Sequence, residues 1–374
     1  MNTDRVCAEI NLGNIEHNFR EIKRITDGAG IIAVIKADGY GHGAVPLAKL
    51  YEKLGATLFA VACINEAIEL RDAGISLPIL ILGPTDPQHA ELLVKHSLTQ
   101  SVCTLAYARA LSDEAEKFSA KIKVHIKLDT GMTRLGLYSH PGFSETAADD
   151  AEKIAKLPAL HAEGIFTHFC ESEAEDKAYT DAQFDAFTAT VEELKSRGVT
   201  FNFCHCANSG AVVNYKRGHL NCVRPGLILY GISPTGKKIE GVDLRPAMTF
   251  RSMVADVRYI KKGDFVSYNR TYQAERDMKI AVISCGYADG LHRSLSRLGE
   301  FKIHGKRAKI LGNICMDLTV VDVTDIPDVK QFDPVIIYDS ELIYDQARLA
   351  GTITYELMTS VSKRVPRTYI SADA

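Results

Sequence analysis

Residues 30–43 read GIIAVIKADGYGHG. The apolar run over residues 30–35 has the composition of a strand that is buried on both faces. It ends at Lys36, and a glycine-rich turn that contains Tyr40 follows at once. A lysine at the end of a strand is usually a solvated cap. Its meaning therefore depends on what the rest of the chain places beside it.

Short apolar runs of this kind recur through residues 1–230. Helix-period segments alternate there with short apolar runs, and this alternation predicts βαβ units and a parallel sheet. Eight such units favour a closed (β/α)₈ barrel over an open doubly wound sheet, and residues 39–43 lack the glycine spacing of a dinucleotide fingerprint. The expected strands are 30–35, 57–62, 78–82, 98–102, 123–128, 162–167, 201–204 and 221–223; the expected helices include 14–26, 44–54, 64–73, 86–95 and 177–197.

A polar segment, TGKKIEGVDLRP at residues 235–246, separates this part from a strand-rich remainder with few helices. A chain of 374 residues is too long for one ordinary core. We therefore expect a barrel domain over residues 1–235 and a β-rich domain over residues 236–374, with the first few residues able to pack against the second domain. The expected strands of the second part are 248–260, 265–268, 279–284, 308–311, 318–323 and 334–338.

The composition excludes several classes of protein. Apolar residues make up 46% and charged residues 24% of the chain, as in soluble globular proteins. The formal net charge of -3 indicates neither nucleic acid nor an anionic membrane surface as a partner. No run of 18 apolar residues predicts a membrane span, and the first residues lack a signal sequence, so we expect a cytoplasmic protein.

The nine cysteines are scattered and odd in number, which indicates reduced thiols. Cys204, His205 and Cys206 resemble metal ligands only superficially. Ligands at neighbouring positions of a strand point to opposite faces, and no second CxxC or HxxxH motif accompanies these three residues. We expect no metal site.

In a barrel of this kind the active site lies at the carboxyl ends of the strands. A serine hydroxyl and glycine amides there can bind a phosphate, and a desolvated lysine near cations can form a Schiff base. An arginine can face a pyridine nitrogen or clamp a carboxylate. Each side chain alone is an ordinary cap or turn residue, but together they suit pyridoxal phosphate and an amino-acid substrate. The residues that follow the expected strands are Lys36, Tyr40, Arg134, His168, His205, Asn208, Ser209, Arg224 and Gly226.

Seven motifs follow one another along the chain: AVIKADGYGHG at 33–43, KLDTGMTRLG at 127–136, THF at 167–169, ANS at 207–209, RPG at 224–226, GYADG at 286–290 and CMD at 315–317. These motifs, in this order, resemble the alanine racemase family over nearly the whole chain. The resemblance implies a pyridoxal-phosphate barrel, a β-rich second domain and a head-to-tail homodimer with shared active sites.

The resemblance also implies roles for individual residues. Lys36 would hold the cofactor and act as one acid/base, and Tyr268 of the other subunit would act as the second, on the opposite face of the substrate. Arg134 would bind the substrate carboxylate, and Arg224 would face the pyridine nitrogen. The remaining implied positions are Tyr40, His168, Asn208, Ser209, Gly226 and Leu227 for the cofactor, Met316, Asp317 and Tyr287 for the substrate, and Lys127 and His205 as supports, Lys127 being carbamylated in some relatives.

Four positions depart from the family pattern: Asn269, Leu291, Asn313 and Lys363. We expect them to line the pocket or the path into it. One pocket contact can change discrimination between substrates by roughly 1–3 kcal/mol. The implied reaction is the interconversion of L- and D-alanine, which would supply D-alanine for peptidoglycan, but serine or a broader set of amino acids is an alternative substrate.

Two other classes of function compete with racemisation. A pyridoxal-phosphate decarboxylase on a barrel also uses a lysine at a strand end, but the combination of KADGYGHG and GYADG argues against it. A cofactor-binding regulator without catalysis would be expected to lack Lys36 or Tyr268, and both are present.

Overall fold

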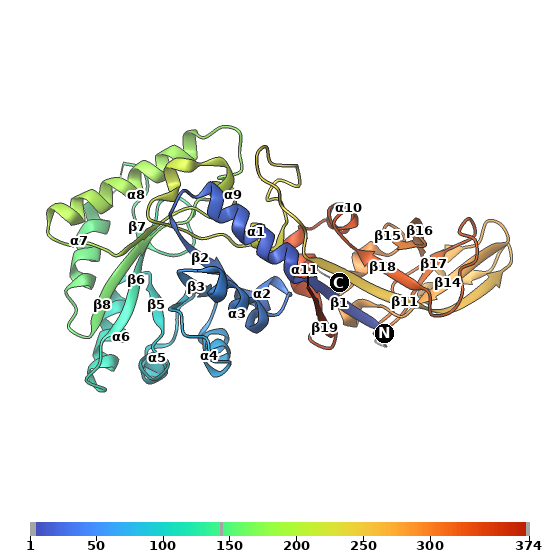
Figure 1. The fold of residues 1–374 in the computed structure, drawn as a ribbon, viewed down its shortest axis with the longest axis horizontal. Helices are drawn as coiled ribbons and strands as arrows, with labels where there is room; N and C mark the ends of the chain where they lie inside the picture. The colour runs from blue at the N-terminus through green and yellow to red at the C-terminus, as the bar shows by residue number, and fades with distance from the viewer. Residues whose placement is uncertain (1–4, 143–144, 372–374) are drawn as a thin grey trace.

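The computed structural model describes residues 5–142 and 145–371. Its first part is a nearly closed barrel of parallel strands, on the left of Figure 1. All eight strands predicted from the sequence are present, and the predicted (β/α)₈ class is confirmed. In barrel order they are β10 (Cys222–Val223), β2 (Gly30–Val34), β3 (Leu58–Val61), β4 (Ile79–Ile81), β5 (Thr99–Val102), β6 (Ile122–Asp129), β8 (Leu160–Phe166) and β9 (Phe203–His205).

The side chain of Asn221 joins the two ends of this sheet. Its Oδ1 accepts a hydrogen bond from the backbone N–H of Cys204 at 2.8 Å, and its Nδ2 donates to the carbonyl of Asn202 at 2.8 Å. The carbonyl of Asn221 accepts from Gly30 N–H at 2.9 Å. One amide thus links β9 to the start of β10, where strands this short leave backbone groups to be paired otherwise.

Helices cover the outside of the barrel (Figure 1). Helix α1 shows why they form: Asn11 caps its first turn by accepting from Asn14 N–H at 2.9 Å, and one face buries Ile15, Phe19 and Ile22. The larger helices of this part are α1 (Leu12–Ile25), α3 (Ala44–Leu54), α4 (Ile64–Asp72), α5 (Ala90–Lys95), α6 (Leu105–Glu116), α7 (Glu145–Ala155) and α8 (Ala178–Ser196).

The second part is an antiparallel sheet, on the right of Figure 1. Its long strand β11 pairs with both β18 and β14, and these pairings close six strands into a ring. The strands of the ring are β11 (Met248–Ile260), β14 (Met278–Ile283), β17 (Thr319–Asp322), β16 (Lys306–Leu311), β15 (Glu300–Ile303) and β18 (Pro334–Tyr338).

Both ends of the chain join this second sheet. Strand β1 (Val6–Asn11) pairs antiparallel with β11, and β19 (Arg367–Ile370) pairs parallel with β1. The first strand therefore belongs to the sheet farthest from it in sequence. The barrel helices begin directly after β1, so the chain crosses between the two parts near residue 11.

The second part differs from expectation in several places. The strand predicted over 265–268 ends at Val266, because Ser267 takes a positive φ of 63° and a 3₁₀ turn (Tyr268–Arg270) follows. The strands β13 (Tyr272–Gln273), β15 and β19 were not predicted, nor were two helices, α10 (Leu342–Ala350) and α11 (Thr354–Ser360). Helix α11 lies at the junction of the two parts, against the turn that begins at Lys36 (Figure 1).

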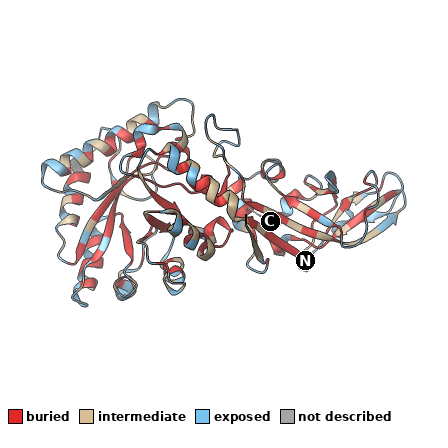
Figure 2. Cartoon of the chain, in the orientation of Figure 1, coloured by how far each residue is buried: buried red, intermediate tan, exposed pale blue. Residues whose placement is uncertain are grey.

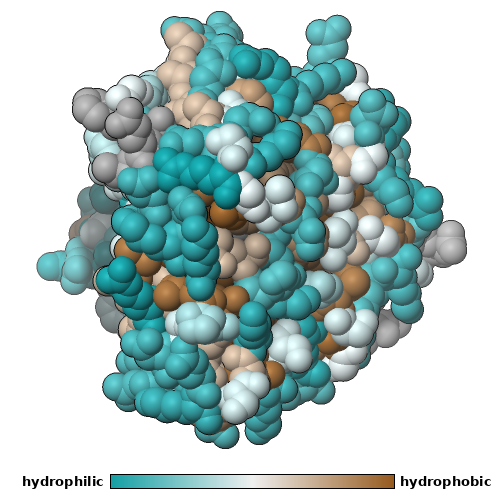
Figure 3. Space-filling model, turned by 90° about the vertical axis from the view of Figure 1, so that its left-hand side faces the viewer, coloured by the Kyte–Doolittle hydropathy of each residue, from teal (hydrophilic) through white to brown (hydrophobic). Residues whose placement is uncertain are grey.

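Buried residues follow the strands of both sheets and the inner faces of the helices (Figure 2). The barrel end of the molecule, which faces the viewer in Figure 3, is covered mainly by hydrophilic side chains, with hydrophobic ones scattered among them. Within residues 5–142 and 145–371, no helix has the length and apolar character needed to cross a bilayer.

Candidate active site

The turn after β2 is a short left-handed helix. Ala37, Asp38, Gly39 and Tyr40 all have φ between 52° and 59°. Such a backbone costs about 1–2 kcal/mol for each residue that carries a Cβ. Tertiary contacts must therefore hold it in place, and strain of this kind is concentrated at functional sites.

Two carboxylates hold this turn. Asp38 Oδ1 accepts from the N–H of Ala44 at 2.8 Å, at the start of α3. Glu66 Oε1 accepts from the N–H of Ala37 at 2.7 Å, and its Oε2 accepts from Ala62 N–H at 2.7 Å. The turn is also packed closely, since a Cβ on Gly41 would overlap the carbonyl oxygen of Met358 in α11. The glycines that looked unusual in the sequence are needed for this backbone path.

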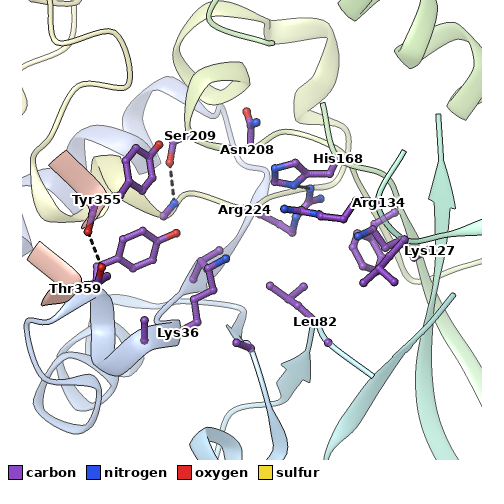
Figure 4. Close-up of a pocket in the computed structure, with 18 of the residues that line it drawn as sticks. Lys36, Leu82, Lys127, Arg134, His168, Asn208, Ser209, Arg224, Tyr355 and Thr359 are labelled. Carbon is purple, nitrogen blue, oxygen red and sulfur yellow. Dashed lines mark hydrogen bonds between the residues drawn. The ribbon is translucent and has the colours of Figure 1, made fainter. Parts of the chain in front are cut away.

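The carboxyl ends of the barrel strands surround a cavity of about 480 Å³, drawn in Figure 4. Four cationic side chains face it, and a single carboxylate, that of Glu173, lines it among the described residues. The sequence placed most of these residues on one rim, and the structure brings them together. The polar lining residues are Lys36, Tyr40, Lys127, Arg134, His168, Glu173, Asn208, Ser209, Arg224, Tyr355 and Thr359.

Lys36 points into the middle of the cavity (Figure 4). Burial lowers the pKa of its amine, the positive charge of Arg134 lowers it further, and Glu66 acts in the opposite direction. Lys127 lies in the wall, where burial lowers its pKa to about 8. Both amines are thus more readily neutral than a surface lysine, and only a neutral amine is nucleophilic.

Arg224 is held by acceptors on every side except one. Its NH1 donates to His205 Nδ1 and to the His205 carbonyl, both at 2.9 Å. Its NH2 donates to the carbonyls of Thr167 at 2.7 Å and Cys206 at 3.2 Å, and approaches His168 Nδ1 at 3.3 Å. Burial lowers the pKa of this guanidinium to about 10, so it remains charged at neutral pH.

The neighbouring imidazole is neutral. Burial, followed by the charge of Arg224, lowers the pKa of His168 well below its usual value. Since Arg224 can only donate, His168 Nδ1 must accept, and its proton therefore resides on Nε2. His168 contributes a hydrogen-bond donor to the cavity but no charge.

Ser209 and Gly226 form a small polar cradle at another wall. Ser209 Oγ accepts from the N–H of Gly226 at 2.9 Å, the dashed line near the label Ser209 in Figure 4. A Cβ on Gly226 would lie 2.6 Å from the hydroxyl oxygen of Tyr40, so only glycine leaves this backbone accessible. Asn208 caps the adjacent helix α9 (Ser209–Asn214) through Ala211 N–H at 3.0 Å. A serine hydroxyl beside a glycine backbone at the wall of the cavity suits a phosphate.

Four of the singled-out residues lie away from this cavity. Tyr268, Tyr287, Met316 and Asp317 belong to neighbouring loops of the second sheet, and none of them lines the cavity of its own chain. Tyr268 is 69% and Met316 53% exposed. Backbone bonds join the loops, from Tyr287 N–H to Cys315 O and from Ala288 N–H to Met316 O, each at 3.0 Å. Leu227 also lies outside the lining, buried directly after Gly226.

The positions that depart from the family pattern do not line the cavity of their own chain, and their place along the path into it stays a prediction. None of Asn269, Leu291, Asn313 and Lys363 lines the cavity. Asn269 takes a φ of 62°, a conformation that asparagine adopts more readily than other residues with a Cβ, which explains why it can replace glycine. Asn313 Nδ2 donates to the carbonyl of Tyr268 at 3.0 Å. Leu291 is core, and Lys363 is exposed.

The sequence did not indicate Tyr355 and Thr359, which reach the cavity from α11. The segment TYELMTS carries only a weak helical signal, and nothing in it indicates proximity to Lys36. The sequence did not indicate a role for Glu66 either, although this residue lies in the first turn of α4, the helix that follows the second barrel strand.

The Cys204-His205-Cys206 segment does not gather ligands. His205 bonds to Arg224, and Cys206 Sγ donates to the Gly218 carbonyl at 3.1 Å. Across residues 5–142 and 145–371, no cluster of three or more histidine, cysteine or carboxylate side chains is arranged to hold a metal ion.

The fold and the cavity together define a (β/α)₈-barrel enzyme with a buried, readily neutralised lysine at the end of a strand. Residues 10–234 match the family "Alanine racemase, N-terminal domain", and residues 247–369 match "Alanine racemase, C-terminal domain". The chain belongs to the alanine racemase family, whose members are isomerases acting on an amino acid.

Individual relatives resemble this chain over nearly its whole length. The chain is 43% identical to the alanine racemase of Desulfovibrio desulfuricans, covering 98% of both chains. It is similar to the alanine racemase structure of Clostridium difficile 630, with a TM-score of 0.95 at 35% identity over 100% of this chain and 98% of that one. It is also similar to an alanine racemase from Bartonella henselae with covalently bound pyridoxal phosphate, with a TM-score of 0.88 at 27% identity over 98% and 100% of the two chains.

Proposed function

We propose that this protein interconverts L- and D-alanine with pyridoxal phosphate held by Lys36. The observation that carries the proposal is the meeting of a buried lysine of lowered pKa with a phosphate-type cradle in one cavity. In this proposal residues 1–235 hold the cofactor, and residues 236–374 contribute to the active site of a second copy. The product D-alanine would serve peptidoglycan synthesis in the cytoplasm.

The residues around the cavity suit this cofactor. Ser209, Gly226, Leu227 and Tyr40 would bind its phosphate, with Asn208 holding the helix that carries Ser209. His168 would lie beside its ring. When bound to an amino acid, pyridoxal phosphate delocalises the electron pair left by the departing α-proton, and this acidifies that proton.

Arg224 would face the pyridine nitrogen with its Nε–H. All of its terminal N–H groups already donate within the protein, whereas no hydrogen bond within the described residues uses Nε–H. Arginine gives up no proton at neutral pH, so it offers the nitrogen a hydrogen bond and no proton. This limits how far charge moves into the ring and favours simple proton exchange at the α-carbon.

Racemisation needs an acid/base on each face of a planar carbon. Lys36 supplies one face. Tyr268 would supply the other from a second copy of the chain, because it is largely exposed and lies outside its own cavity. Tyr287, Met316 and Asp317 share its surface and would meet the substrate there. A head-to-tail homodimer satisfies both requirements.

Arg134 would bind the substrate carboxylate from within the cavity. Lys127 stands near it, and its pKa of about 8 leaves part of the amine neutral under mildly alkaline conditions. A neutral amine is the form that reacts with carbon dioxide, so Lys127 suits the carbamate found in some relatives. That carbamate would place a negative charge beside Arg134 and orient it.

Alanine is favoured over serine as the substrate. The departures that raised serine as an alternative, at Asn269, Leu291, Asn313 and Lys363, do not line the cavity of their own chain and add no polar contact to it from within that chain. Leu82 and Leu135 add apolar surface to its wall. The relatives named above are all called alanine racemases.

A substrate panel tests the proposal. Purified protein with pyridoxal phosphate is given each L-amino acid separately in D₂O, and NMR follows loss of the α-proton while chiral chromatography detects the D-form. Exchange and inversion should be fastest for alanine. Faster inversion of serine would assign the alternative substrate, and absence of inversion for all amino acids would refute racemisation.

A complementation experiment tests the sharing of active sites. Lys36→Ala should abolish covalent capture of the cofactor, detected by borohydride reduction and peptide mass, whereas Tyr268→Phe should retain capture but lose racemisation. Mixed dimers of the two variants contain one intact site and should recover part of the activity. No recovery in dimers proven to be mixed would mean that each chain builds its own site.

A further inference from the structure

A line of buried polar side chains runs through the barrel beneath the cavity. His205 Nε2 and His125 Nδ1 are 2.9 Å apart, and His205 Nδ1 faces Arg224 NH1 at 2.9 Å. Both imidazoles are fully buried. Phe203 stacks on His125 and Phe166 on His205, with ring centroids 5.4 Å and 4.8 Å apart, so neither ring can turn easily.

The line continues to Glu163, which is buried on β8. The register of β6 and β8 shifts between Val124 and His125, so Glu163 is an extra residue in a bulge. Its Oε1 lies 3.9 Å from His125 Nε2, longer than a hydrogen bond but a direct charge–dipole contact. The neighbouring Gly164 makes room for the imidazole, since a Cβ there would lie 2.6 Å from the His125 ring.

The two ends of this line determine where its protons lie. Arg224 only donates, so His205 Nδ1 accepts and the His205 proton is on Nε2. His205 Nε2–H therefore donates to His125 Nδ1, which leaves the His125 proton on Nε2, directed at Glu163. Burial, followed by the charge of Arg224, lowers the pKa of His125 to about 3 and that of His205 well below its usual value, consistent with two neutral rings.

Glu163 acts as the acceptor at the far end. The hydroxyl of Thr99 donates to its Oε1 at 3.1 Å, and the ammonium of Lys123 lies 3.3 Å from its Oε2. One oxygen thus accepts a hydrogen bond, and the other faces a positive charge. The carboxylate therefore acts as an acceptor and not as a donor. The hydrogen bonds of the line run from Arg224 to His205 and from His205 to His125, and His125 Nε2 makes no hydrogen bond of its own but faces the carboxylate at 3.9 Å. A donor-only group at one end and a carboxylate at the other favour the same arrangement of the ring protons.

We propose that Glu163 and His125 are positioning residues that keep Arg224 oriented toward the cavity. They do so by holding His205 in its Nε2–H tautomer. This inference rests on the proposed function, because it gives Arg224 its importance at the cofactor nitrogen. The reversed line would place a His205 Nδ1–H against Arg224 NH1, donor against donor, and would push the guanidinium out of place.

Glu163→Gln tests the direction of the line. The amide of glutamine can donate to His125 Nε2 and so permits the reversed arrangement. Nitrogen-15 NMR of the full-length protein, labelled at histidine and free of cofactor, distinguishes protonated from unprotonated ring nitrogens. We expect one Nε2–H tautomer for both histidines in the wild type and a mixture in Glu163→Gln.

Two further variants complete the test. Thr99→Val removes a donor to the same carboxylate without adding one, so both tautomers should stay as in the wild type. His125→Gln retains an acceptor for His205 and should keep its tautomer, whereas His125→Leu removes that acceptor. A wild-type Nδ1–H tautomer at either histidine, or unchanged tautomers in both Glu163→Gln and His125→Leu, would overturn the proposal.

The ratio of transamination products to D-alanine tests whether the orientation of Arg224 affects the reaction. With cofactor and L-alanine, a displaced Arg224 should raise several-fold the ratio of pyruvate and pyridoxamine phosphate formed to D-alanine formed, and the rise should appear in Glu163→Gln but not in Thr99→Val. An unchanged ratio beside altered tautomers would refute the link to Arg224. Absence of racemisation in the wild type, with the tautomers as expected, would instead refute the proposed function.

Discussion

Glu66 Oε1 and the backbone nitrogen of Ala37 are 2.7 Å apart, so a helix after the second barrel strand holds the first residue beyond Lys36. The other oxygen of the same carboxylate accepts from Ala62 N–H at 2.7 Å. Glu66 therefore fastens the left-handed turn to the end of β3. It also places a negative charge near the Lys36 amine.

Glu66→Gln is expected to weaken both effects. An amide has one oxygen, so one of the two exposed N–H groups loses its protein partner, at a cost of about 0.5–1.5 kcal/mol in the free energy of unfolding. The pKa of Lys36, which Glu66 raises, should fall further below its usual value. Chemical denaturation and the pH dependence of cofactor capture measure the two effects. Glu69→Gln, on the exposed side of α4, is the matched control and should change neither.

Asn269 is predicted to matter for its backbone and not for its side chain. Asn269→Gly should be tolerated, because glycine adopts a φ of 62° without strain. Asn269→Val should cost about 1–2 kcal/mol and lower kcat more than it raises KM, since the strained turn displaces Tyr268. Steady-state kinetics of the two variants measure both effects. An equal loss of kcat in both variants would show that the side-chain amide of Asn269 itself is needed.

Asp289 is a structural anchor of the GYADG loop. Its carboxylate is fully buried and bonds to Arg5 at 2.6 Å, Arg364 at 2.9 Å and Gly286 N–H at 3.0 Å. Asp289→Asn should destabilise the fold by about 2–3 kcal/mol, less than for a wholly buried pair because both guanidiniums reach solvent. Urea denaturation measures this loss. Asp256→Asn, an exposed partner of Arg258 in the same sheet, should leave stability unchanged.

His42 should make the protein less stable in acid. Burial lowers its pKa to about 4, and its Nδ1–H donates to the Tyr40 carbonyl at 3.0 Å. In the unfolded chain the pKa is about 6.5. Between these values the unfolded state binds a proton that the folded state does not, so stability falls as the pH falls from 6.5 to 4, by roughly 3 kcal/mol in total.

His42→Asn isolates this contribution. Asparagine retains a donor for the Tyr40 carbonyl but has no proton to gain. The free energy of unfolding should therefore depend less steeply on pH in the variant between pH 4 and 6.5, while the two slopes agree above pH 7. Identical slopes over the whole range would mean that His42 is not a source of the acid sensitivity.

Local patterns predicted the barrel because each strand can be predicted from the residues of that segment alone. Apolar runs bounded by turn residues located all eight strands, and the rule that parallel strands share one carboxyl edge gathered Lys36, His168, Ser209 and Arg224 on one rim. The strand predicted over 265–268 failed for the opposite reason. The positive φ of Ser267 is imposed by the contact of its hydroxyl with the Asn313 carbonyl, which no local pattern contains.

The sequence by itself determined the fold class, the lysine at the end of the first barrel strand and the family. These follow from periodicity and from short motifs, which are local. Only the tertiary structure decided that Tyr355 completes the cavity, that β19 pairs with β1, and that a bulge directs Glu163 toward His125. Such contacts join residues far apart in the chain, and they exist because closing the barrel and packing the second sheet on it bring those residues together.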